Sequence, residues 1–339
     1  MKLLLALFAL VAVSCASAPK TVSVTEATTD TKTMLTGDYD VLDEYEKIGV
    51  PTFKMAFAIQ SDVSASVAGG ATLGGGSTSG ARASMTTHLT GVQLSEMQEM
   101  TDAAYAKFME DLKKSGREII SLDAIKAHEA FKDIDFTKVE ANKPYTTTQF
   151  GRTYIVLTPK GMPLFFRAGE PLSDQVLGIG NQKAVGSIGY GLKAVMVTPT
   201  ITIDFAATTS SKSGSSLIGR SSVEVNTTPE LSILGGLQTQ MSVITRTNWV
   251  PTAVTGGVAG LKPQKILISS DYGQVTETSV TDNKGLNTSL ALLFGAGTVT
   301  NSTKSIRQIN VTGEKYKALV TPAVAKVTQA FANAVAETK

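Results

Sequence analysis

The sequence predicts an α+β fold, in which an N-terminal α/β layer is followed by a mainly antiparallel β region and a C-terminal helix. Three observations support this. Residues 53–134 alternate strand and helix patterns, residues 194–245 alternate apolar and polar positions with period two, and residues 313–339 carry an apolar stripe at helical spacing. With 339 residues, 42% of them hydrophobic, the chain can bury a substantial core.

The α/β layer is predicted from a strand, a loop and a long helix in succession. FKMAFAIQ (53–60) has the continuous apolar character of a buried strand. Residues 66–84 are rich in Gly and Ser and are expected to form a loop. An apolar stripe predicts a helix over 91–115, with a capping box that starts at Thr90 and with Gly116 just after its end.

Two later segments lead from this layer into the β region. Residues 173–191 are expected to form a Gly-rich helix that lies close to a sheet. In KAVMVTPTITIDF (193–205) the odd positions are mostly apolar, whereas the even positions from Thr198 onward are Thr or Asp, which is the period of a strand. Pro199 and Pro229 restrict the strands around them to sheet edges or irregular points.

The end of the chain predicts a helix. Thr321 suits the N-cap position and Pro322 the first helical position, where the missing N–H has no partner to lose. The apolar face that follows consists of Val324, Val327, Phe331 and Val335. This helix is expected to pack against the sheet.

The first residues predict where the protein resides. Lys2 precedes the apolar stretch from Leu3 to Val13, which at about 1.5 Å per residue is too short to cross a hydrocarbon core of about 30 Å. This pattern is typical of a signal peptide, assigned here to residues 1–14. Cys15, the only cysteine, then has three interpretations: an ordinary residue of a discarded signal, a free thiol or a lipid attachment site.

The neighbouring residues favour lipid attachment. AVSC (12–15) resembles a bacterial lipobox, with Ala in place of the usual Leu. The competing cleavage after Ala18 would leave Pro19 as the first residue, which signal peptidase disfavours. The resemblance implies an acylated Cys15, for example with palmitate. Because Ala16 rather than Asp follows the cysteine, it also implies sorting to the outer membrane.

The chain is therefore expected to have four parts. Residues 1–14 are the signal peptide and residues 15–37, rich in Thr, are the lipid anchor and a flexible tether. Residues 38–205 form the α/β half, and residues 206–339 form the β-rich half with the C-terminal helix. That the two halves form one continuous domain stays open.

No sequence motif supplies a reaction. His88 and His128 stand 40 residues apart without a cysteine partner, so no metal site is expected. The motifs of serine hydrolases and zinc proteases are absent, as is a phosphate-binding loop, so no cofactor and no catalytic residue is assigned. A net charge of +2 without a basic stripe argues against nucleic acid. A non-enzymatic protein is expected, although two carboxylates on different loops could still meet for acid–base chemistry.

Several stretches together resemble bacterial envelope lipoproteins of the curli-secretion CsgG type and relatives with TolB N-terminal-like α/β domains. These are the strand VPTFKMAF (50–57), the unit LSEMQEMTDAAYAKFMEDLKKSGREII (94–120), and the Gly-rich helix that runs into KAVMVTPTITIDF (193–205). The resemblance covers residues 50–205 and is one of pattern, so no functional residue is carried over from it. It implies an α/β layer followed by a strand-rich half.

These observations predict a non-enzymatic, periplasm-facing lipoprotein of the cell outer membrane that acts as a structural or assembly component of the envelope. Its expected partners are the membrane, through the lipid, and other envelope proteins or further copies of the chain. Two alternatives stay open. One is a CsgG-like oligomeric outer-membrane secretion channel with hairpins from residues 194–245 in the membrane. The other is a protein that binds a small ligand between the two halves.

Overall fold

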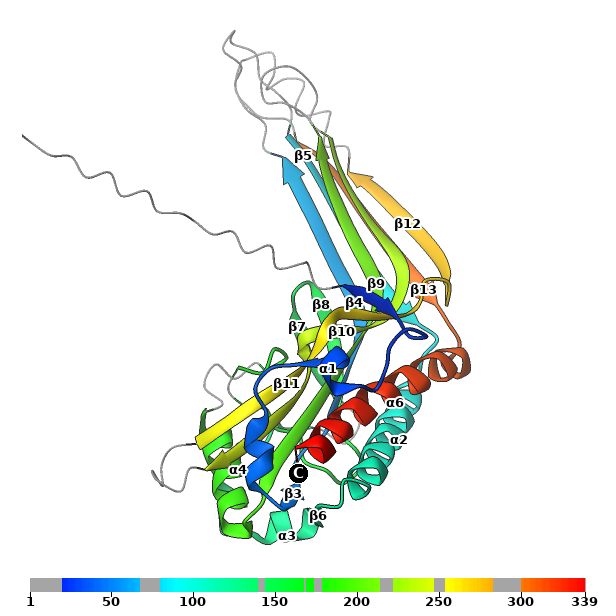
Figure 1. Cartoon of the computed structure of the whole chain (residues 1–339). Helices are drawn as coiled ribbons and strands as arrows, with labels where there is room; N and C mark the ends of the chain where they lie inside the picture. Colours follow the sequence, from blue (N-terminus) through cyan, green and yellow to red (C-terminus); the bar gives the residue numbers. More distant parts are fainter. Residues whose placement is uncertain are drawn as a thin grey trace, which may run out of the picture.

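The structure is a computed structural model and describes residues 20–67, 80–139, 144–167, 169–173, 179–213, 222–246, 254–282 and 300–338. It confirms the α+β fold class: strands from both halves of the chain join in one mixed sheet, and a helix closes the chain (Figure 1). Cys15 and the rest of residues 1–19 lie outside the described residues.

Over the described residues the sheet contains thirteen strands, most of them in the order β1-β11-β10-β9-β4-β5-β13-β12. The strands are β1 (Thr21–Ser23), β2 (Leu35–Thr36), β3 (Lys47–Gly49), β4 (Lys54–Val67), β5 (Gly80–Thr90), β6 (Glu118–Ile120), β7 (Tyr145–Gln149), β8 (Arg152–Leu157), β9 (Val195–Ser213), β10 (Ser222–Arg246), β11 (Val254–Ser269), β12 (Gln274–Asp282) and β13 (Thr300–Asn310).

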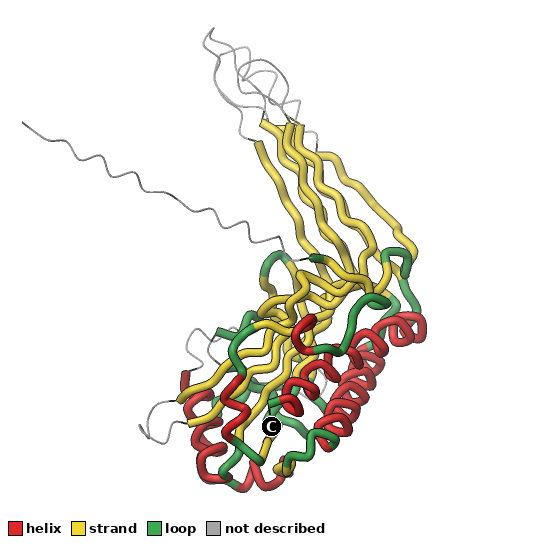
Figure 2. Tube along the Cα trace, in the orientation of Figure 1, coloured by secondary structure: helices red, strands yellow, loops and turns green. Residues whose placement is uncertain are grey.

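Helices cover the two faces of the lower part of this sheet (Figure 2). The helices are α1 (Thr31–Met34), α2 (Leu94–Lys113), α3 (Leu122–Ala127), α4 (Ile179–Leu192) and α6 (Gly313–Glu337), with two 3-10 turns, η1 (Asp40–Glu44) and η2 (Glu129–Asp133). Helices α2 and α6 pack side by side on one face, and α4 lies on the other.

The period-two pattern of β9 explains this arrangement. Its odd residues, such as Val197 and Ile203, belong to the main core under α2 and α6, together with Phe57 of β4 and Phe108 of α2. Met196 points to the opposite face and belongs to a second core beneath α4. Alternation therefore separates two layers, as the sequence predicts.

The two prolines lie at irregular points of the sheet, as predicted. On the side of β9 away from β10, the pairing with β3 ends at Met196 and that with β4 begins at Thr200, so Pro199 stands between the two partners. The register of β10 against β9 shifts between Pro229 and Ser232. Proline, which has no N–H, is tolerated at such points because no hydrogen bond to a neighbouring strand is required of it.

Strands β4, β5, β9, β10, β12 and β13 continue beyond the helix-covered part and project from it as long hairpins (Figure 1). We call this projection the blade and define it as residues 62–67, 80–88, 207–213, 222–229, 274–282 and 300–308; the remainder of the described chain is the body. In the blade, β4 pairs with β5, β5 pairs in parallel with β13, and β13 pairs with β12. The hairpin of β9 and β10 lies against β5 and β13, where Arg307 donates to Asn226 and to the carbonyl of Thr227.

The blade corrects one expected loop. The loop predicted over 66–84 is shorter, because β4 runs to Val67 and β5 begins at Gly80; residues 68–79 lie outside the described residues. Strand β9 likewise runs through Ser/Thr-rich sequence to Ser213. These stretches contain few large apolar residues, but backbone pairing with a neighbouring strand keeps them extended.

The expectation of a flexible tether is wrong for residues 20–36. Residues Thr21–Ser23 form β1, parallel to β11, and Leu35–Thr36 form β2 on the same strand. Between them, the ammonium of Lys326 on α6 donates to the carbonyls of Val24 and Ala27 at 2.7 Å. Paired backbone groups and a buried Met34 hold this segment against the body, although its Thr-rich sequence has no periodicity.

The helix ends also differ from the predictions. The N-cap of α2 is Gln93, whose capping box is completed by Glu96, rather than Thr90. Helix α6 begins at Gly313 with Thr312 as its N-cap, so Thr321 does not cap it and Pro322 lies inside. The side chain of Thr312 caps the helix, so the helix begins earlier than predicted. Packing of the helix against α2 and the sheet compensates for the hydrogen bond that Pro322, which has no N–H, cannot make.

Candidate functional site

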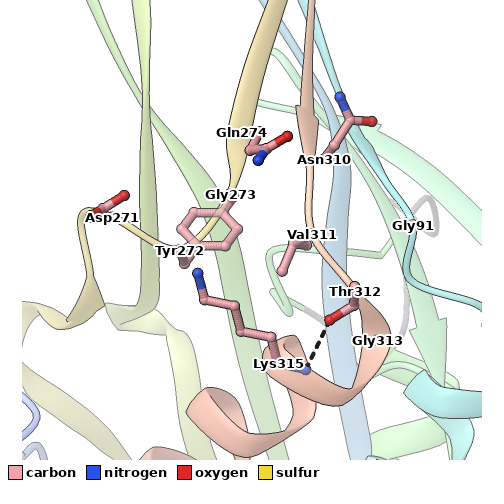
Figure 3. A pocket seen from close by; sticks show the side chains of 10 residues that line it. All are labelled: Gly91, Asp271, Tyr272, Gly273, Gln274, Asn310, Val311, Thr312, Gly313 and Lys315. Carbon is pink, nitrogen blue, oxygen red and sulfur yellow. Dashed lines mark hydrogen bonds between the residues drawn. The ribbon is translucent and has the colours of Figure 1, made fainter.

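A groove lined by several polar side chains lies where the blade meets the body, at the foot of β12 and β13 (Figure 3). It has a volume of about 710 Å³. Three elements build it: the turn before β12, the end of β13 and the first turn of α6. The lining residues are Gly91, Asp271, Tyr272, Gly273, Gln274, Asn310, Val311, Thr312, Gly313 and Lys315.

The floor of the groove is rigid. Tyr272 is fully buried and its hydroxyl donates to the carbonyl of Phe205 at 2.5 Å, which ties the turn before β12 to β9. Burial raises the pKa of Tyr272, and the nearby Tyr316 and Asp204 add to this effect. The phenol therefore stays neutral and acts as a structural donor.

Two glycines permit the close contacts around the groove. Gly91 has a φ of +87°, and a Cβ there would lie 2.2 Å from the carbonyl oxygen of Val311. A Cβ on Gly313 would lie 1.8 Å from the carboxylate oxygens of Glu96. Because the Glu96 carboxylate already occupies the start of α6, the positive end of that helix is largely compensated within the chain.

The walls carry polar groups that point into open space. Lys315 extends its ammonium upward from α6, Asp271 stands on the opposite wall, and the amides of Gln274 and Asn310 lie above (Figure 3). Within the described part of the chain, the ammonium of Lys315, the carboxylate of Asp271 and the amide of Gln274 have no hydrogen-bond or ion-pair partner. Asn310 accepts from Thr90 and donates to Thr276, so only part of its amide is free. The groove can bind a polar group of either charge but holds no nucleophile with an adjacent base.

A second cluster of charged residues is buried in the body. The Lys54 ammonium lies 3.0 Å from the Glu170 carboxylate and 3.2 Å from the carbonyl oxygen of Phe165. Burial lowers the pKa of Lys54, and Glu170 opposes this shift. A lysine with a lowered pKa is a candidate catalytic amine. Here both side chains are at most 2% exposed, so no substrate reaches them, and the pair instead links residues 165–167 and 169–173 to β4 of the sheet.

The residues considered from sequence lie apart from both places. His88 is half-buried on β5. His128 is half-buried after α3, where its Nδ1 accepts from the Ala130 N–H and its ring packs on Gly191. Among the residues that the structure describes, no three His, Cys, Asp or Glu side chains gather in a way that could hold a metal.

Sequence reasoning did not find the groove. The sequence Thr312-Gly313 before an apolar helical stripe was a usable signal, because it would have placed the start of α6 beside the end of β13.

No helix in the described part of the chain combines the length and apolarity needed to cross a membrane. Comparisons with protein-family models, curated proteins and solved structures find no match to this chain. The site and fold therefore define the protein only as an α+β protein with a projecting blade and a polar groove at its foot.

Proposed function

We propose that this protein is a non-enzymatic lipoprotein of the bacterial cell envelope that acts there as a structural or assembly component. It is anchored to the outer membrane through a lipid on Cys15 and faces the periplasm. The observation that carries the proposal is the blade: long, regular hairpins that project from the body beside the N-terminal strand and present backbone edges rather than a catalytic cleft.

The register of the sheet relates the blade to the N-terminus. Ser23 pairs with Leu267, Leu267 with Ser232, and Ser232 with Asp204, so β1 lies at the level where the blade leaves the body. Lys20 follows Cys15 by five positions, a stretch that reaches at most about 18 Å when fully extended. A lipid on Cys15 would keep the foot of the blade close to the membrane surface.

The first test is the anchor. Intact mass of the protein purified from membranes is expected to equal residues 15–339 plus acyl chains, and Cys15→Ala should move the chain to the soluble fraction. Ser14→Ala, which leaves the cysteine in place, serves as the matched control and should stay with the membrane. A Cys15→Ala variant that remains membrane-bound would contradict the anchor.

A second candidate function is a CsgG-like oligomeric secretion channel of the outer membrane. The observation that favours it is that β5, β12 and β13, with 11, 9 and 11 residues, all project in one direction. A membrane-crossing strand needs about 9–11 residues. Against it, the described blade surface carries charged side chains such as Asp62 and Arg82.

The two candidates differ in size and conductance. A channel predicts a ring-sized particle in detergent and stepwise conductance in planar lipid bilayers. An assembly component predicts a lipidated protein without conductance. Discrete conductance from the purified full-length protein would favour the channel, whereas a small particle that leaves bilayers silent would favour the assembly component.

A further inference from the structure

Over the residues that the structure describes, several segments of the blade have an unpaired edge: residues 62–67 of β4 pair only with β5, and the blade parts of β9 and β10 pair only with each other. Strand β12 is unpaired on one side over its whole length. Within the described sheet, five strands pair with a single neighbour, and β12 is the longest of them at nine residues. It pairs with β13 through nine consecutive residues without a register shift. Its outer edge therefore offers a straight row of backbone donors and acceptors that a further strand could use.

The opposite end of the sheet is treated differently. The outer edge of β11 is covered by β1 and β2, which the chain supplies from its own N-terminal segment. Proteins also protect open edges with proline, lysine or a bulge. The sequence of β12, QVTETSVTD, contains neither proline nor lysine. The Glu277 carboxylate is paired with Arg307 of β13 at 2.5 Å, so its charge does not protect the open edge.

The open edge ends in the groove. Strand β12 starts at Gln274, a groove residue, and runs away from it up the blade (Figure 3). An antiparallel strand added beside β12 would therefore run down the blade and end in the groove with its C-terminus. Antiparallel pairs are the more stable of the two arrangements per residue.

The charges of the groove fit such an end. Lys315 offers an ammonium without a partner among the described residues, on the wall formed by α6. Asp271 on the opposite wall would repel a carboxylate, and Glu96 lies against Gly313 behind the first turn of α6. Lys315 is thus the one lining side chain with a positive charge, and Gln274 can donate through its amide.

We infer that the edge of β12 and the groove at its foot bind the C-terminal segment of a partner polypeptide, which adds as an antiparallel strand with its terminal carboxylate at Lys315. This inference deepens the proposed function, on which it rests for the existence of a partner in the envelope. Main-chain hydrogen bonds along β12 supply affinity, and the carboxylate fixes direction and register. An internal segment or a second copy of this chain would lack the carboxylate.

The test uses full-length protein in detergent and the peptide KTVTVTVTQ, labelled at its N-terminus, with a free C-terminal carboxylate. Fluorescence anisotropy should show binding, and amidation of the C-terminus should weaken it by about tenfold, the effect of one charged hydrogen bond. In Lys315→Met the acid and amide forms should bind equally. Lys317→Met is the matched control, because Lys317 lies on the same helix but pairs with Glu99 outside the groove, and it should keep the difference.

Backbone methylation tests the strand addition itself. Methyl groups on alternate peptide nitrogens face one edge of the added strand only, so one of the two alternating patterns should weaken binding by about tenfold or more while the other has little effect. Equal binding of both methylated peptides would overturn the inference, as would no binding up to about 1 mM. An acid–amide difference that persists in Lys315→Met would overturn the assignment of the carboxylate.

Self-association is measured on the same samples. Sedimentation would overturn the inference if the protein forms oligomers that the peptide does not dissociate and the peptide does not bind. The edge would then be assigned to a second copy of this chain. A peptide that does not bind would not change the membrane fractionation of Cys15→Ala. The two experiments therefore test the proposed anchor and this binding site separately.

Discussion

The body and the blade belong to one sheet but are stabilised in different ways. The body buries large apolar side chains, among them the phenylalanines Phe53, Phe57, Phe108, Phe205 and Phe331, all with no exposed area. In the part of the blade whose side chains are described, the buried residues are Ala65, Ala83, Met85, Thr87, Thr227 and Ser305. The blade therefore depends on backbone pairing far more than on burial of apolar area.

Among the described residues, buried polar atoms without a partner occur in both regions, and in the body they include the hydroxyls of Thr198 and Tyr316 and the side-chain amide of Gln240. In the body, the hydroxyl of Thr202 donates to the carbonyl of Gln238 at 2.5 Å. In the blade, the hydroxyls of Thr87 and Thr227 are buried without a partner among the described residues, as is the Nε of Arg307. Each unpaired group costs free energy, which a change of packing or a bound partner could recover. Because the blade buries little apolar area, we expect it to be the less stable region and the one suited to interaction.

The largest expected effect is loss of a core aromatic. Phe108→Ala should lower the free energy of unfolding by about 3–5 kcal/mol, because it removes a fully buried ring that lies 5.9 Å from the Phe53 ring. Met85→Ala in the blade should cost about 2 kcal/mol, the lower end for a buried Met, because the residues paired with it, Val63 and Ser305, are small. Urea unfolding followed by circular dichroism compares the two. Equal losses would contradict the distinction between the regions.

A buried arginine gives the next effect. Arg117 donates from Nε to the Val335 carbonyl at 3.0 Å and from Nη1 to the Leu42 carbonyl at 2.6 Å, joining the end of α6 to η1. Arg117→Met should cost about 3 kcal/mol, since it leaves buried carbonyls without donors. The control, Arg82→Met on the exposed side of the blade, should change the free energy of unfolding by less than about 0.5 kcal/mol. Similar losses for both variants would show that Arg117 does not clamp the helix end.

The same substitution should have opposite signs in the two regions. Thr202→Val removes a hydroxyl that makes a hydrogen bond and should destabilise the body by about 1 kcal/mol. Thr227→Val removes a hydroxyl without a partner among the described residues and should be neutral or stabilise the chain by up to about 1 kcal/mol. Thermal unfolding of the two single variants measures both. Destabilisation by Thr227→Val would indicate that its hydroxyl is satisfied.

The smallest effect concerns acid. Burial acts to raise the pKa of Asp111 on α2, but hydrogen bonds from Lys107 and Lys114 at 2.8 Å outweigh it and hold the pKa below 3.8. Asp111 thus stabilises the folded body above pH 3.8, and this contribution is lost as pH falls through the lower folded pKa. Because both lysines are substantially exposed, we expect less than about 1 kcal/mol. Asp111→Asn should be less stable than the native chain at pH 7 and nearly equal to it near pH 2; a constant difference would contradict the titration.

Local pattern allowed part of the fold to be predicted. The stripe of α2 and the alternation of β9 were recognisable because helices and strands repeat over a few residues, and both elements bury the faces that the repeats indicate. The groove could not be found in this way. It forms only because β5 pairs in parallel with β13, which brings Gly91 next to Val311, 220 positions further along the chain.

The sequence by itself determined the α+β class, the helical stripes and the two-faced β9, since these depend on neighbouring residues. Only the tertiary structure decided that Lys54 sits beside Glu170, that residues 20–36 cover the edge of β11, and that β12 has an open edge above a groove. The physical reason is that a buried charge or a strand edge is defined by its partner. In this chain the partners of those groups lie far away in sequence, where no local repeat reports them.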